Sequence, residues 1–180
     1  MSEEVIPTSN PKMRLKRPLF QKANEALYNF LDYLKEENVS SDRILFVRFP
    51  HVTTPRNLSR YQRGNTVAAI IEKYGYNFVS FEPDDPQINL EPSNDFYNIE
   101  HMNIYGQQKF SKYFAHYLQD NYNITPTKLT EQQKEQWDQT IPYYEAYVKY
   151  NEEMLNNGTP PQEIGESYFT MREIRKYLDE

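Results

Sequence analysis

The chain has 180 residues, of which 38% are hydrophobic and 26% charged, and its net charge is −6. This composition is typical of one globular domain with an appended segment, and the acidic balance argues against nucleic-acid or anionic-membrane partners. Cysteine is absent, which excludes disulfides and thiolate chemistry, and no stretch reaches the roughly 20 apolar residues of a membrane span or resembles a signal peptide.

The first predicted elements are an extended segment, a helix and a strand. Residues 1–17 carry prolines and few apolar residues, so we expect a poorly ordered lead-in. After Pro18, apolar residues recur at steps of three and four positions, which predicts an amphipathic helix that ends near Asn38 and covers a sheet. The apolar run Ile44–Val47, stopped by Pro50, predicts a strand buried on both faces.

The middle of the chain continues the alternation of helices and strands. Apolar positions from Val67 to Tyr74 predict a helix that closes at Gly75, and residues 77–81 predict a second strand. A loop rich in Pro and Asp follows, and an aromatic helix is predicted from about Ile104 to Tyr122. This order of elements predicts a parallel α/β sheet. Ligands bind at the carboxyl ends of such strands, so we expect Arg48, His51 and the loop 82–101 on one functional edge.

Residues 125–180 predict a helical tail. Thr130 and Gln133 match a capping box, and an apolar stripe from Trp137 to Val148 is interrupted by Pro142, which predicts a kink or a restart. A turn at residues 156–161 precedes a last short helix, predicted over residues 171–177.

The segment from Asp95 to residue 106 contains the strongest chemical signal. Acidic and amide residues lead into His101 just before the predicted helix start. A neutral imidazole can act as a general base near neutral pH when a partner fixes its tautomer. The simpler interpretation is a histidine that hydrogen-bonds near the N-terminus of the helix. A metal site from His51, His101 and Asp84 or Asp85 would match no known ligand spacing, so we predict no metal and no cofactor.

The stretch 94–111, NDFYNIEHMNIYGQQKFS, resembles the last conserved block of SGNH (GDSL-type) hydrolase-like proteins. The likeness is to the bacterial branch that includes acyl-transfer proteins of cell-surface polymers. The helical segment with Trp137 and Tyr143–Tyr144 resembles the tail that follows this block, so the resemblance covers roughly residues 18–150. It implies a partial three-layer flavodoxin-like fold over residues 18–124, with helices on both faces of a parallel sheet, and ester hydrolysis or O-acyl transfer.

The resemblance also implies roles for particular residues. The family uses a serine near its first strand, an Asp-x-x-His pair in the last block, and an oxyanion hole with a glycine and an asparagine. His101 matches the base, and Asn98 stands where the aspartate is usual. An amide oxygen can accept the imidazole N–H but stabilises an imidazolium less than a carboxylate does, so Asp95 and Glu100 are alternative partners. Arg48, His51 and Asn103 complete our predicted site as substrate contacts.

The serine block of the family is absent from these residues. No Gly-Asp-Ser occurs, and the first glycine is Gly64, so no nucleophile with an oxyanion hole is visible. We therefore expect the C-terminal half of a protein that acts on an acylated glycan at the extracytoplasmic cell surface, inactive by itself. Exposed sheet edges predict self-association. The alternative is a non-catalytic binding or scaffold protein that uses its aromatic helices for partners.

Overall fold

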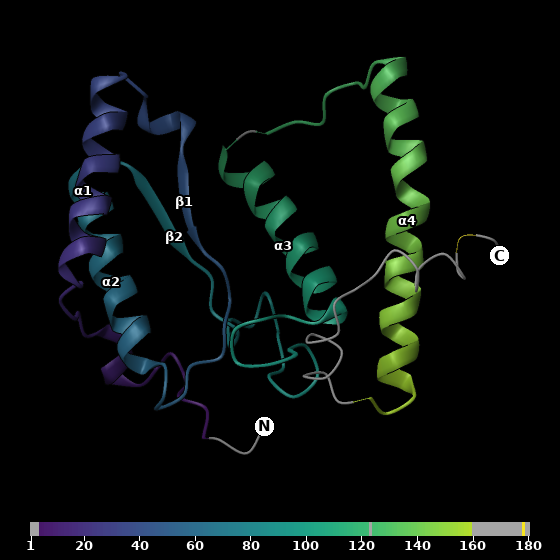
Figure 1. The fold of residues 1–180 in the computed structure, drawn as a ribbon, viewed down its shortest axis with the longest axis horizontal. Coiled ribbons are helices and arrows are strands. Elements are labelled where there is room, and N and C mark those ends of the chain that lie inside the picture. The colour runs from purple at the N-terminus through teal and green to yellow at the C-terminus, as the bar shows by residue number, and fades with distance from the viewer. Residues whose placement is uncertain (1–3, 123, 160–177, 179–180) are drawn as a thin grey trace. The chain divides into compact units, whose positions relative to one another are not determined.

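The protein is mixed α/β, and its computed structural model describes residues 4–122, 124–159 and 178. The described residues form four α-helices and a two-stranded parallel sheet (Figure 1). In chain order the elements are η1 (Pro11–Arg14, a 3-10 helix), α1 (Gln21–Glu36), η2 (Ser41–Arg43, a 3-10 helix), β1 (Leu45–Arg48), α2 (Leu58–Lys73), β2 (Asn77–Ser80), α3 (Ile104–Tyr122) and α4 (Glu131–Asn156).

The chain divides into two compact units, residues 1–86 and residues 87–180. The division falls inside the loop rich in Pro and Asp that follows β2. The domain boundaries expected from composition near residues 17 and 124 stay predictions, because composition reports where the chain becomes polar, whereas compact units are defined by which segments pack together. Within the described residues, no helix is both long and apolar enough to cross a membrane.

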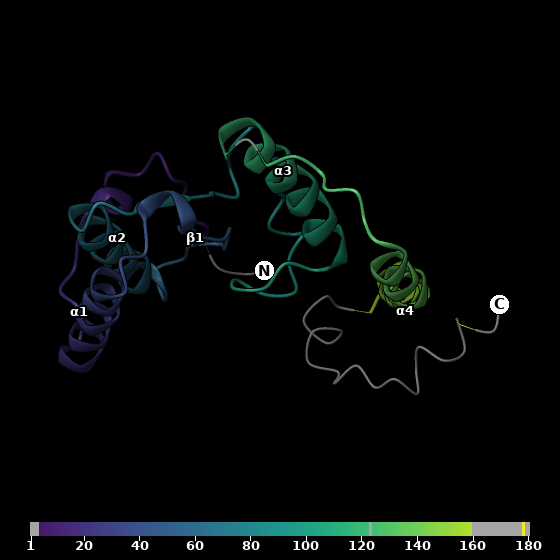
Figure 2. The ribbon, with the colours of Figure 1, turned by 90° about the horizontal axis from the view of Figure 1, so that it is seen from above.

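The first unit is a β-α-β arrangement with an additional helix. Strands β1 and β2 pair in parallel, with Phe46 opposite Phe78 and Arg48 opposite Ser80. Phe46 and Phe78 pack against a core that includes Leu31 of α1 and Ile71 of α2. Because residues opposite each other project from the same face of a sheet, both helices cover one face, as Figures 1 and 2 also show.

The predicted helix that covers a sheet is therefore confirmed for α1. The prediction that the strand at residues 44–47 is buried on both faces is wrong, because all four residues of β1 are only partly buried. An apolar run shows that a strand packs against something, but the run does not say on how many faces. Gly75 follows α2 with φ +84°, in the left-handed conformation expected after a helix C-terminus.

Residues 4–17 differ from the expected poorly ordered lead-in. Met13 of η1 is buried, and three polar side chains of α2 hold the backbone of this segment. Gln62 donates to the carbonyl of residue 12 (2.9 Å), Asn65 to that of Met13 (2.6 Å) and Thr66 to that of Arg17 (2.7 Å). These hydrogen bonds come from polar residues far along the chain, so the local composition of residues 1–17 contains no sign of them.

The second unit contains the loop of His101 and helices α3 and α4. The bounds predicted for the aromatic helix and the capping box of Thr130 and Gln133 are both confirmed. Of the two alternatives predicted at Pro142, a restart is wrong, since α4 runs through that residue from Glu131 to Asn156, and a kink stays a prediction. The short helix predicted over residues 171–177 lies outside the described residues.

Candidate functional site

His101 lies in a short loop that is closed by backbone pairing. An isolated antiparallel bridge joins Phe96 to Met102, and the Tyr97 amide donates to the His101 carbonyl at 2.8 Å. Inside this closure, the Asn98 side-chain oxygen accepts from the backbone N–H groups of Glu100 (2.8 Å) and His101 (3.0 Å). An asparagine that accepts from backbone groups just ahead of it forms a local turn. Asn98 therefore shapes the loop that presents His101.

The same Asn98 oxygen lies 3.0 Å from Nδ1 of the His101 ring. Two backbone N–H groups already donate to this atom, so it must be the oxygen end of the amide, and Nδ1 must carry the ring proton. Nε2 is then the hydrogen-bond acceptor, and it has no hydrogen-bond partner among the described residues. The His101 side chain is exposed. This tautomer and this exposure are what a general base requires.

Asp95, the alternative partner for His101, is used elsewhere. Its side chain is only 1% exposed, and one carboxylate oxygen accepts from the Glu91 amide (2.8 Å) and from the Lys109 ammonium (2.7 Å). The carboxylate thus ties the loop to α3. The structure corrects the proposed role of Asp95 in catalysis, since Asn98 is the residue that contacts the ring.

Asn103 begins α3 instead of facing a substrate. Its side chain is fully buried, and its oxygen accepts from the backbone N–H groups of Tyr105 (3.0 Å) and Gly106 (3.2 Å). Its amide nitrogen donates to the Asn94 carbonyl at 2.6 Å. The predicted substrate contact is therefore corrected to a helix cap, because a buried side chain with these bonds cannot reach a ligand.

Gly106 lets α3 start directly against the Asp95 backbone. A Cβ at this position would lie 2.2 Å from the Asp95 carbonyl oxygen, which is closer than atoms can approach. The backbone N–H of Asn103 also donates to the Asp95 carbonyl oxygen, at 2.9 Å. Gly106, Asn103 and Asp95 therefore form the rigid base of the loop that carries Asn98 and His101.

Arg48, at the carboxyl end of β1, belongs to a closed polar cluster in the first unit. Its guanidinium donates to the Ser80 hydroxyl (2.7 Å), to the Asn65 side-chain oxygen (3.1 Å) and to the Tyr61 carbonyl (3.3 Å), and it lies over the Tyr61 ring, 4.2 Å from the centroid. The Ser80 and Tyr61 hydroxyls both donate to Glu82, at 2.6 and 2.7 Å. Arg48 thus links the strand ends to α2.

The pKa of Tyr61 is raised because its phenol is partly buried in this cluster. Burial of the phenol raises its pKa well above the ordinary value of 10.0, and the hydrogen bond to the Glu82 carboxylate raises it further. Glu82 is the first residue of the loop predicted at this edge, whereas Ser80 and Tyr61 were not predicted from the sequence. The signal that could have found them is the position of Arg48 and a serine at the ends of two parallel strands, where polar side chains meet.

His51 follows the same strand end. Its Nδ1 lies 3.3 Å from the Phe49 carbonyl oxygen, and its ring lies 5.8 Å from that of Tyr61 between centroids. Arg48 and His51 thus lie in the first unit, whereas Asn98, His101 and Asn103 lie in the second. The prediction that all of them share one functional edge stays a prediction.

The described residues contain no group of three or more histidine, aspartate or glutamate side chains arranged to hold a metal ion. Asp84, considered above as a ligand, accepts from the hydroxyl of Thr8 at 2.7 Å.

Comparisons of the chain with models of protein families, with curated proteins and with solved structures give no match. Its function must be argued from the residues and their geometry.

Proposed function

We propose that this chain is the C-terminal part of an SGNH-like ester hydrolase or O-acyltransferase that acts on an acylated cell-surface glycan. The observation that carries the proposal is the 3.0 Å contact between Nδ1 of His101 and the side chain of Asn98, three positions earlier. The Asp-x-x-His pair of that family has the same spacing, with a carboxylate in place of the amide. The contact orients the exposed ring so that Nε2 is available as a base.

In the proposed reaction, Nε2 of His101 removes the proton of a serine hydroxyl while the serine oxygen attacks the acyl carbonyl. The protonated imidazole then returns the proton to the sugar oxygen as the ester C–O bond breaks, leaving an acyl-serine. Water, or an acceptor hydroxyl in a transferase, attacks the acyl-serine while His101 again accepts the proton. The acyl–serine C–O bond then breaks, and the imidazolium returns the proton to the serine oxygen, which releases the acid or the new ester. Asn98 holds the ring throughout. The serine and the oxyanion hole would come from a segment outside these residues.

The first unit would supply part of the sheet in this proposal. A β1-α2-β2 arrangement with parallel strands is the repeating unit of three-layer flavodoxin-like folds. Further strands would extend the sheet, and further helices would cover its second face.

The decisive test starts from the DNA directly upstream of this chain. An in-frame segment with Gly-Asp-Ser after a predicted strand is expected. That segment should be co-expressed with the chain, and acetate release from an O-acetylated polysaccharide should be measured. His101→Ala is expected to lower the rate at least about 100-fold, the usual contribution of a general base.

His116→Ala is the matched control, because His116 is an exposed histidine on α3. It should leave the rate unchanged. The chain alone should turn over p-nitrophenyl acetate no faster than buffer does. A full rate with His101→Ala, or turnover by the chain alone that His101→Ala abolishes, would contradict the proposal of an incomplete site.

Self-association follows from the same proposal. Within the described residues the sheet has two strands, so each strand has one edge without a paired strand. Unpaired strand edges favour pairing with other chains. Sedimentation equilibrium is expected to find dimers or larger species, and a monodisperse monomer would count against this expectation.

The second candidate is a non-catalytic binding or scaffold protein. It is favoured by the N-terminal half of α4, where residues 131–145 are all exposed and include large aromatic side chains. The upstream DNA separates the two candidates, because the absence of any in-frame serine block would support this one.

A further inference from the structure

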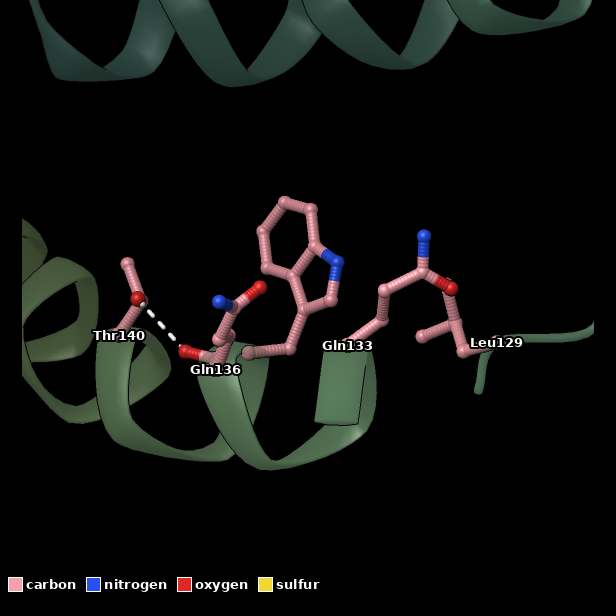
Figure 3. Close-up of a pocket in the computed structure, with 5 residues that line it drawn as sticks. Leu129, Gln133, Gln136 and Thr140 are labelled. Carbon is pink, nitrogen blue, oxygen red and sulfur yellow. Dashed lines mark hydrogen bonds between the residues drawn. The ribbon is translucent and has the colours of Figure 1, made fainter. Parts of the chain in front are cut away.

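An open cavity of about 380 Å³ lies beside the first turns of α4. It is lined by Leu129, which precedes the helix, and by Gln133, Gln136, Trp137 and Thr140 of the helix (Figure 3). Small-ligand sites occupy about 300–1,000 Å³, so the cavity has room for a ligand of a few tens of atoms at most. The lining has apolar groups at Leu129 and Trp137, and amide or hydroxyl groups elsewhere. No lining side chain is charged, which favours a neutral ligand.

Trp137 is the only tryptophan of the chain, and 56% of its side chain is exposed. An indole is the largest apolar side chain, and its ring face is electron-rich. That face attracts the slightly positive C–H groups of a flat partner. One face of a sugar ring presents such C–H groups, while its hydroxyls point outward.

The Gln133 side chain is oriented by the capping box. Its oxygen accepts from the Thr130 amide (3.0 Å) and the Thr130 hydroxyl (3.1 Å), so its NH₂ group is the end that remains to donate. Figure 3 shows the side chains of Gln133 and Gln136 rising from the same side of α4. The Gln136 side chain has no hydrogen-bond partner among the described residues. The Thr140 hydroxyl donates to the Gln136 carbonyl at 2.8 Å, which leaves its oxygen able to accept.

We infer that this cavity binds a neutral sugar ring, stacked on Trp137, whose hydroxyls accept from Gln133 and Gln136. A purely apolar partner, such as a helix, would cover both carboxamides without giving them hydrogen bonds, which costs free energy. Sugar hydroxyls satisfy those groups. The inference rests on the proposed function only for the choice of a glycan, and it gives α4 the role of holding the sugar part of the substrate.

The test is a fluorescence titration of the chain with maltotetraose, cellotetraose and tetra-N-acetylchitotetraose. Because Trp137 is the only tryptophan, its emission reports the cavity directly. At least one sugar should give a saturable blue shift. Sugar binding measured this way needs no turnover, so failure of the esterase proposal leaves the result readable.

Two variants separate recognition from folding. Gln133→Glu keeps an oxygen that can accept from Thr130 but loses the NH₂ donor, so helix content by circular dichroism should stay unchanged while sugar affinity falls about five- to tenfold. Tyr143→Ala removes an exposed aromatic side chain of α4 that does not line the cavity, and it should bind sugar as the wild type does.

Trp137→Ala, followed by NMR titration, should abolish binding. The inference is overturned if no sugar gives a saturable change, if Trp137→Ala binds equally well, or if the emission shifts with protein concentration alone. That last outcome would assign the surface to contact between copies of the chain.

Discussion

The first unit contains a polar cluster around Arg48 and the second contains one around His101, and the two differ in how far their polar groups are hydrogen-bonded. Around Arg48, each donor and acceptor described above meets a partner: the guanidinium bonds to Ser80, Asn65 and Tyr61, and both hydroxyls bond to Glu82. Around His101, one ring nitrogen bonds to Asn98, while the other faces no described partner in an exposed loop.

A cluster whose groups satisfy one another stabilises a fold, because any ligand would have to break existing bonds to enter. A ring with one oriented and one open nitrogen can take up a proton or a ligand at little cost. From the sequence, Arg48 was expected to contact substrate and His101 to act as the base. We expect Arg48 to contribute to stability and His101 to the proposed chemistry, and the following variants separate these roles, from the largest effect to the smallest.

The largest effect is expected from Gly106→Ala, which breaks the base of the His101 loop. A Cβ there would overlap the Asp95 carbonyl oxygen, and backbone cannot move aside cheaply. The free energy of unfolding in urea should fall by about 3 kcal/mol. Gly75→Ala is the control, since its Cβ would meet no atom within 4 Å and only its φ of +84° is unfavourable. That variant should lose about 1 kcal/mol. Equal losses in the two variants would argue against the close contact.

Arg48→Met should lower the free energy of unfolding by about 2 kcal/mol, because it leaves the groups around it without their donor. Arg43→Met, at an exposed position of η2, is the matched control and should change stability by less than about 0.5 kcal/mol. His101→Ala should match the control in a thermal melt. If His101→Ala were as damaging as Arg48→Met, the contrast between the two clusters would fail.

Tyr61→Phe tests the same cluster more gently. Removing the hydroxyl that donates to Glu82 should cost about 1 kcal/mol at neutral pH. The raised pKa of Tyr61 also sets a pH dependence. Above about pH 10 the unfolded chain loses the phenol proton while the folded chain keeps it, so stability falls as pH rises toward the folded-state pKa. Urea midpoints measured between about pH 9 and about pH 11 should therefore fall less steeply with rising pH in Tyr61→Phe than in the wild type. Parallel slopes would show that Tyr61 does not contribute.

A small change in stability is expected from Asn98→Ala, which removes one local turn and should cost about 1 kcal/mol or less. The substitution should also change the tautomer of the His101 ring, because it removes the oxygen that accepts from Nδ1. Nitrogen chemical shifts of the ring should report the Nδ1–H tautomer in the wild type and a mixture of tautomers in Asn98→Ala. A wild-type ring protonated at Nε2 would contradict the assigned orientation.

Much of the fold follows from local patterns. The apolar stripe before Asn38, the aromatic positions of α3 and the capping box of α4 predicted those helices, because periodicity and end signals are local. The hydrogen bonds that hold residues 12–17 and the continuation of α4 through Pro142 did not follow from local patterns. In the first case side chains of α2 supply the bonds, and in the second the helix continues on both sides of the proline.

In the candidate site, too, some features followed from the sequence and others only from the packing of distant residues. The family resemblance pointed to His101 and to Asn98, three positions earlier, with Asp95 and Glu100 as alternative partners, and the structure places the Asn98 oxygen 3.0 Å from the ring nitrogen. Only the tertiary structure decided that Asp95 serves Lys109, that Asn103 caps α3, and that Arg48 is enclosed by Tyr61 and Ser80. Those roles depend on partners brought together by packing, and a side chain with several suitable neighbours bonds to the one that folding places within reach.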